Sequence, residues 1–166
     1  MTAAGDRSSA RPGDGLLHPI ALGALVVLVV NDQVLKEAWP GPLTGILSDV
    51  AGLIVAPLAA VAAWEIGAWV IGRWGGPSRV ALAVAIVLVG TAFALVQLWS
   101  PLTDVYRVGL GVVQWPFAAF GAIVSGASMP PVRPVIAVAD AEDLLALPAL
   151  AVSWWVGTRR APRRSR

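Results

Sequence analysis

Cysteine is absent from this 166-residue sequence, and histidine occurs once, as His18. The first absence excludes disulfides, thiolate metal sites and cysteine nucleophiles, and it leaves the redox compartment open. The second confines any imidazole chemistry to one position. Histidine-rich metal motifs, P-loops, the motif G-x-S-x-G and a Ser-His-Asp set are missing too. The sequence therefore predicts no metal site and no cofactor.

Charged residues are also scarce. Only 13% of the residues are Asp, Glu, Lys or Arg, whereas 57% are hydrophobic, and the mean hydropathy is +0.75. A soluble domain is about 25% charged and about half apolar, so the excess apolar surface is expected to face lipid. The composition predicts an all-α, polytopic integral membrane protein. High alanine, valine, glycine and arginine usage indicates a GC-rich bacterium, and hence the plasma membrane.

Four apolar stretches are long enough to cross a bilayer as helices, at about 16–35, 47–71, 80–98 and 139–156. They predict two helical hairpins in a transmembrane domain over 16–157. A polar, disordered tail precedes this domain at 1–15, and a basic tail follows it at 158–166. The apolar stretch 108–127 contains Gln114, Pro116 and four glycines. It is predicted to be a re-entrant or interfacial segment rather than a further span.

The distribution of basic residues predicts the orientation. With four spans, one side carries nine Lys and Arg residues, in the two tails and the turn at 73–79, and the other carries Lys36, Arg107 and Arg133. Cytoplasmic loops hold the excess of basic residues, so both termini are expected in the cytoplasm. Tryptophans are expected near both boundaries: Trp39, Trp99 and Trp115 outside, and Trp69, Trp74, Trp154 and Trp155 inside.

Two acidic stretches interrupt the apolar runs on the predicted outer side. The first is Asn31-Asp32-Gln33-Val34-Leu35-Lys36, with Ser48-Asp49 beyond it, and the second is Asp140-Ala141-Glu142-Asp143. We expect the two stretches to face each other and to form a binding site. Its predicted members are Asn31, Asp32, Lys36, Ser48, Asp49, Asp140 and Asp143. A charged group near the hydrocarbon region is energetically costly, so we take such residues as candidate functional residues.

Each acid also has a structural explanation. Asp49 and Asp140 can cap the helices that they precede, and Asp104 can cap the segment that follows it. Asp32 lies near a helix C-terminus, where the dipole disfavours an anion. Lys36 follows one turn later, so an i,i+4 ion pair would offset part of that cost and pin the hairpin.

Three functions remain open. The first is a non-enzymatic membrane protein whose outer polar face binds a protein partner, an ion through oxygen ligands, or a lipid head group. The second is an aspartate-dependent hydrolase of a membrane-embedded substrate, because a carboxylate pair can act as general acid and base. Its candidate catalytic residues are Asp32, Asp104, Asp140 and Asp143. The third is transport, which ranks last because only Glu65 lies deep, and Glu65 is expected to snorkel toward the inner boundary.

The expected partners follow from the same composition. The lipid bilayer is the first, and faces of small residues favour a homo-oligomer or a protein partner. No nucleic-acid partner is expected.

The stretch Asp32-Gln33-x-x-Lys36 at the end of the first span resembles the D-Q-x-x-K stretch of bacterial lipoprotein signal peptidase. Ala139-Asp140 at the start of the last run resembles that family's A-D motif, and Asp104 takes the place of its other aspartate. The resemblance implies four spans, both termini inside and two catalytic aspartates at the outer face. The family's N-x-G-A-A-F and G-N-x-x-D-R stretches are absent, and Asp104 is three residues from Arg107 instead of adjacent.

A second resemblance covers most of the chain. Residues 31–36, 43–53 and 140–148 are similar to N-D-H-x-L-K, L-T-G-K-L-S-D-x-A-G-L and D-x-x-D-L-x-A-L-P in small uncharacterised bacterial membrane proteins. Gln33 and Ile46 stand where that pattern has His and Lys. This resemblance implies a four-span membrane protein and brings no activity with it.

Overall fold

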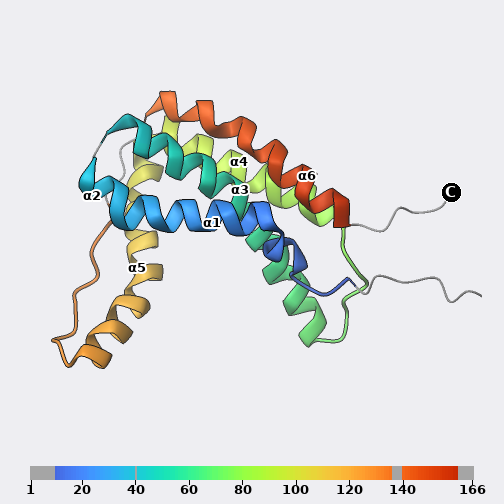
Figure 1. Ribbon diagram of the computed structural model, residues 1–166, viewed down its shortest axis with the longest axis horizontal. Helices are drawn as coiled ribbons and strands as arrows, with labels where there is room; N and C mark the ends of the chain where they lie inside the picture. The colour runs from blue at the N-terminus through green and yellow to red at the C-terminus, as the bar shows by residue number, and fades with distance from the viewer. Residues whose placement is uncertain (1–9, 40, 136–139, 161–166) are drawn as a thin grey trace, which may run out of the picture. The chain divides into compact units, whose positions relative to one another are not determined.

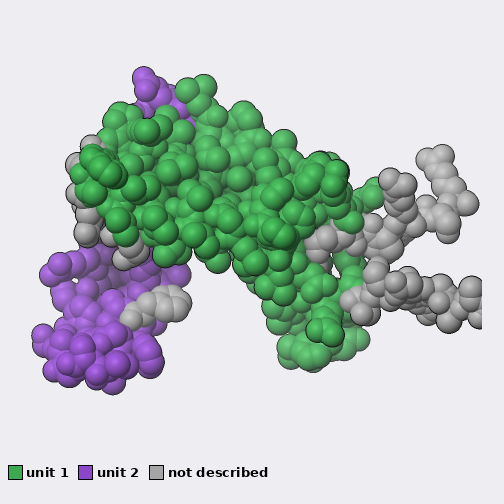
Figure 2. Space-filling model, viewed as in Figure 1, with its two compact units in different colours: residues 1–90, 145–166 green, residues 91–144 purple. Residues whose placement is uncertain are grey.

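The computed structural model describes residues 10–39, 41–135 and 140–160. Every regular element in these ranges is helical, as the composition predicts (Figure 1). The elements are η1 (Asp14–Leu17), α1 (Pro19–Val30), the π-helical η2 (Asn31–Leu35), α2 (Lys36–Ala38), α3 (Pro42–Val70), α4 (Arg79–Leu98), α5 (Ser100–Ser125), η3 (Ala141–Ala149) and α6 (Leu150–Arg160). They belong to two compact units, residues 1–90 with 145–166 (unit 1) and residues 91–144 (unit 2) (Figure 2).

Three of the described helices, α3, α4 and α5, are long and apolar enough to cross a membrane. Two of them correspond to the predicted spans at 47–71 and 80–98. The predicted span at 16–35 is divided between the 12-residue α1 and the π turn η2, which follows it without a break. The predicted span at 139–156 lies mostly in the 3-10 helix η3 and the 11-residue α6.

The stretch 108–127 differs from its prediction. Up to Ser125 it belongs to α5, which runs unbroken from Ser100 despite Pro116 and ends at Gly126 with φ 68°. Glycine adopts this left-handed conformation without steric cost, so it ends helices well. A re-entrant hairpin is therefore not confirmed, whereas an interfacial position of α5 stays a prediction.

Unit 1 is built around small side chains that let helices approach closely. Its buried core consists of Ala21, Leu58, Val61, Leu82, Ala85 and Val156. At Gly157 of α6, a Cβ would lie 2.5 Å from Leu82 Cδ2 of α4, so only glycine fits this position without a shift. Without hydrophobic driving force between helices in lipid, such close packing is a main source of helix association.

A proline inside α3 is matched by a hydroxyl from α6. Pro57 has no N–H, so the carbonyl of Leu53 loses its usual helical donor. Ser153 is 0% exposed, and its Oγ lies 3.0 Å from the oxygen of Leu53 and 2.9 Å from that of Ile54. The hydroxyl thus satisfies the backbone group that the proline leaves open, which is what permits proline in an apolar helix.

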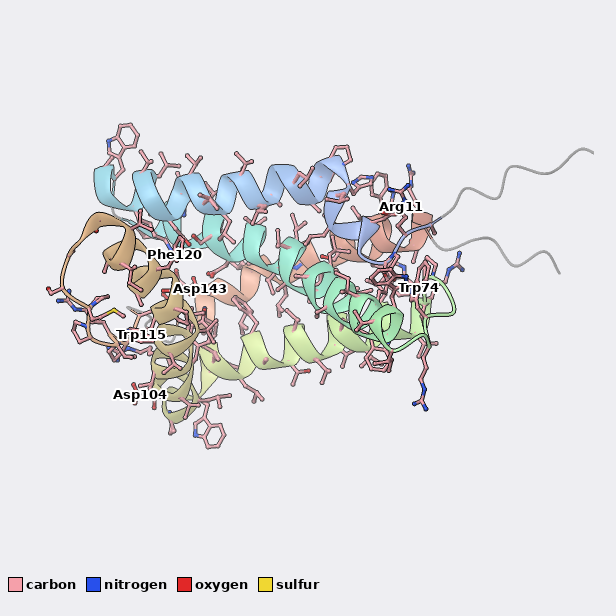
Figure 3. All side chains as sticks on the ribbon, turned by 90° about the horizontal axis from the view of Figure 1, so that it is seen from below. Arg11, Trp74, Asp104, Trp115, Phe120 and Asp143 are labelled. Atoms are coloured by element: carbon pink, nitrogen blue, oxygen red, sulfur yellow. The ribbon has the colours of Figure 1, made fainter. Side chains whose placement is uncertain are left out.

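In unit 2 the segment after α5 runs back along that helix. Val135 N donates to the carbonyl of Arg107 over 3.0 Å, and Trp115 Nε1 donates to the carbonyl of Pro130 over 2.8 Å (Figure 3). Between these contacts lies Gly111, where a Cβ would collide with the carbonyl oxygen of Arg133 in the returning segment. Only glycine allows so close an approach of two backbones.

Candidate functional site

The first polar group lies where α1 passes into η2. Asn31 is 0% exposed, and its amide Nδ2 donates to Thr44 O and to Ser48 Oγ, each over 2.7 Å. Both acceptors belong to α3, so one side chain joins the end of the first apolar helix to the start of the next. A buried amide that makes both of its donor bonds fixes the register of this hairpin.

The same network continues through a serine to an ion pair. Ser48 Oγ accepts from Asn31, and its own proton goes to Asp32 Oδ1 over 2.6 Å. Lys36 Nζ lies 2.7 Å from the same carboxylate oxygen, so the expected i,i+4 pair is confirmed. The direction of each hydrogen bond follows from the groups involved, because the amide nitrogen can only donate and the ionised carboxylate can only accept. We call Asn31, Asp32, Lys36, Ser48 and the Thr44 carbonyl the η2 network.

Charge and exposure divide the η2 network into a base and a rim. Asn31 and Ser48 form the buried base, while the side chains of Asp32 and Lys36 are 42% and 43% exposed. The ammonium group and the serine hydroxyl both favour the ionised carboxylate. The result is an accessible pair of opposite charges held in place by buried hydrogen bonds.

One atom of this network has no partner. Asn31 Oδ1 is buried and accepts no hydrogen bond from any described residue. An unsatisfied buried acceptor costs about 1–3 kcal/mol, and such a group in a native protein calls for an explanation. Asn31 opens the π turn η2, and π turns are frequently found at functional sites.

The prediction that Asp49 caps the start of α3 is wrong. The helix begins at Pro42, which is favoured at the first helical position because its missing N–H would be unpaired there anyway. Ser48 and Asp49 therefore lie inside α3 and do not cap it. The earlier start gives Ser48 its role, since it places this side chain beside η2.

The second polar group lies in unit 2, at the start of η3. Gln97 is 9% exposed; its Nε2 donates to Asp143 Oδ2 over 2.7 Å, and its Oε1 accepts from Asp140 N over 3.3 Å (Figure 3). Asp140 Oδ1 accepts from Glu142 N over 2.9 Å, so Asp140 caps this helix as predicted. Sequence reasoning missed Gln97 as a positioning residue, although an amide near the end of an apolar run was the signal.

Asp104 does not cap a helix. It lies in the second turn of α5, where Arg107 Nη1 is 3.3 Å from its Oδ1 and its side chain is 73% exposed (Figure 3). The start of α5 at Ser100 puts Asp104 too late for capping. An exposed pair of this kind contributes about 0–1 kcal/mol, so it marks no special site.

Glu65 does not snorkel. It is 3% exposed, and its Oε2 accepts from Gly13 N over 2.8 Å. Ser78, the residue before α4, and Gly15 line a cavity of ≈ 20 Å³ beside it, which is room for about one water molecule. The carboxylate thereby ties η1 to α3, a contact between residues 52 positions apart that no local pattern indicates.

The predicted binding residues divide between the two units. The η2 network of unit 1 contains Asn31, Asp32, Lys36 and Ser48. Asp49 lies in the same unit. Asp140 and Asp143 meet at Gln97 in unit 2. A site shared by both acidic stretches stays a prediction. Within the described ranges, no group of three or more His, Asp or Glu side chains is suited to hold a metal ion.

Comparison of the chain with protein families, curated proteins and solved structures gives no match. What the site can do is therefore argued from its geometry. Ser48 is 8% exposed and its hydroxyl is committed in both directions, so it is poorly placed to act as a nucleophile. Asp32 and Lys36 offer an accessible acceptor and an accessible donor side by side. Such an arrangement can bind a polar or charged group.

Proposed function

We propose that this chain is a four-span protein of the bacterial plasma membrane that binds a ligand at its extracytoplasmic polar end. Both termini lie in the cytoplasm, as the excess of basic residues in the tails and in the turn at 73–79 supports. Three apolar helices of sufficient length support the membrane assignment.

The observation that carries the binding function is the η2 network. Its buried amide and hydroxyl hold Asp32 in one position, while the side chains of Asp32 and Lys36, 42% and 43% exposed, remain accessible to a ligand. The ligand is a protein partner, an ion or a lipid head group that presents a donor or a positive charge to Asp32. Ionisable residues within membrane spans are candidates for ligand and ion sites, which supports this assignment.

Site-specific photo-crosslinking in living cells tests this function. A photoreactive residue replaces Val34, which lies in η2 and is 56% exposed. We expect a discrete adduct, and we expect Asp32→Asn to abolish it while Asp104→Asn, which removes the same charge from unit 2, leaves it intact. Mass spectrometry of the adduct then distinguishes protein from lipid.

Two results would count against the binding function. One is the absence of any adduct above that of a photoreactive residue at the exposed Val87 of α4. The other is an adduct that persists in Asp32→Asn. The alternative, an aspartate-dependent hydrolase, predicts in addition that Asp104→Asn or Asp140→Asn alone stops turnover and leaves a trapped substrate at this site.

A further inference from the structure

A second built surface lies at the opposite end of α1, at the start of this helix and the end of α6. Arg159 places its guanidinium carbon 3.8 Å from the centre of the Trp155 ring. The His18 ring meets the same indole edge to face, with the ring centres 6.0 Å apart. All three residues belong to unit 1. The Trp155 ring thus contacts both the Arg159 guanidinium and the His18 imidazole.

The stacking leaves the hydrogen-bond donors of Arg159 available. The contact with the ring is made by the guanidinium carbon, and the N–H groups lie at the edge of the planar group, where they can meet other partners. Within the described part of the chain, Arg159 forms no ion pair with a carboxylate. A planar, pre-oriented guanidinium is the group that binds phosphate in a bidentate manner.

His18 adds a further donor. Its Nδ1 accepts from Ile20 N over 3.2 Å, where it serves as the N-cap of α1. In the neutral ring the proton therefore lies on Nε2, which remains as a donor beside Trp155.

All charged residues in the stretch 150–166 are basic. Residues 150–166 contain five arginines, Arg159, Arg160, Arg163, Arg164 and Arg166, and no Asp or Glu. A polybasic segment directly after an apolar helix attracts anionic lipids. Trp154 and Trp155 are 43% and 40% exposed, and amphipathic indoles of this kind favour the level of the lipid head groups. These features favour a lipid over a free phosphate ion, which gains nothing from exposed indoles.

We propose that Arg159, stacked on Trp155 and flanked by His18, binds the phosphate of an anionic phospholipid, with the arginines that follow adding electrostatic attraction. This surface shares no residue with the η2 network. The proposal rests on the membrane assignment within the proposed function, but not on ligand binding at the η2 network.

Thermal unfolding of the purified full chain tests this inference. The melting temperature is followed by circular dichroism in detergent micelles doped with phosphatidylglycerol or, at the same mole fraction, with phosphatidylcholine. We expect phosphatidylglycerol to raise the melting temperature more, and we expect added NaCl to reduce the difference. Arg159→Gln should remove at least half of it. Arg133→Gln, which takes the same charge from unit 2, should leave it unchanged.

Two further measurements show which chemical group causes the difference in melting temperature. Arg159→Lys keeps the charge without the planar fork and is expected to retain only part of the difference, even if Arg159→Gln folds poorly. Inorganic phosphate added to phosphatidylcholine micelles is expected to give no rise. The proposal is overturned if both lipids raise the melting temperature equally, if inorganic phosphate reproduces the rise, or if Arg159→Lys and Arg159→Gln both respond as the unaltered chain does.

Discussion

Asn31 Nδ2 and Ser48 Oγ lie 2.7 Å apart across 17 positions of sequence, and both side chains are buried. This hydrogen bond connects the end of α1 to the second turn of α3 and sets the position of Asp32 through the serine proton. The candidate site therefore depends on the packing of a hairpin as much as on its charged residues.

Replacing Asn31 tests how much the hairpin depends on this amide. Asn31→Ala removes two buried hydrogen bonds to α3 but also removes the unpaired Oδ1, so we expect the free energy of unfolding in detergent to fall by roughly 1–3 kcal/mol. Val34→Ala, at an exposed position of the same π turn, should cost far less. An equal loss in the two variants would contradict the role given to Asn31.

The contact between Ser153 and the carbonyl of Leu53 predicts strong coupling with Pro57. Ser153→Ala alone should destabilise the protein by about 1–3 kcal/mol, because it leaves a buried carbonyl unpaired. In the background of Pro57→Ala, the restored N–H can take that carbonyl, and the same serine change should cost much less. A double-mutant cycle on unfolding free energies measures this coupling. Additive effects would show that the proline and the serine act independently.

Gly111 provides a test of unit 2. Gly111→Ala places a Cβ against the returning segment, so we expect hydrogen exchange at the amide of Val135, which bonds to Arg107, to become faster. Gly109→Ala is the matched control, since a Cβ there meets no atom within 4 Å. Unchanged exchange at Val135 in Gly111→Ala would contradict the close packing of this segment.

Glu65 predicts a local effect at the other end of α3. Glu65→Leu removes the acceptor of Gly13 N, and hydrogen exchange at that amide should become faster. Glu65→Gln retains an acceptor oxygen of similar reach and should show a smaller change. Equal protection of Gly13 in the unaltered chain and in Glu65→Leu would mean that this hydrogen bond does not hold η1.

The helical class and the central parts of α3 and α4 could be predicted from sequence, because apolar runs of this length have few other solutions. The start of α3 could not, since Gly41 and Pro42 are equally typical of a turn. The partners of Gln97, Ser153 and Glu65 lie 46, 100 and 52 positions away. Contacts over such distances are set by tertiary packing and leave no local pattern.

The candidate site, too, was only partly predictable from the sequence. The Asp32–Lys36 pair follows from helix periodicity and was predicted. Asn31 and Ser48 were also predicted as members of the site, but the hydrogen bond between them was not, because it depends on five additional residues of helix at the start of α3.

Cysteine accessibility tests the central claim, an extracytoplasmic polar end, most directly. The chain has no cysteine of its own, so single cysteines at Val34, Asp140 and Arg79 can be probed with a membrane-impermeant thiol reagent. We predict that the first two are labelled in intact cells and that Arg79 is labelled only after lysis. If Asp140 requires lysis while Val34 does not, the two acidic stretches lie on opposite sides of the membrane, and a common polar end is contradicted.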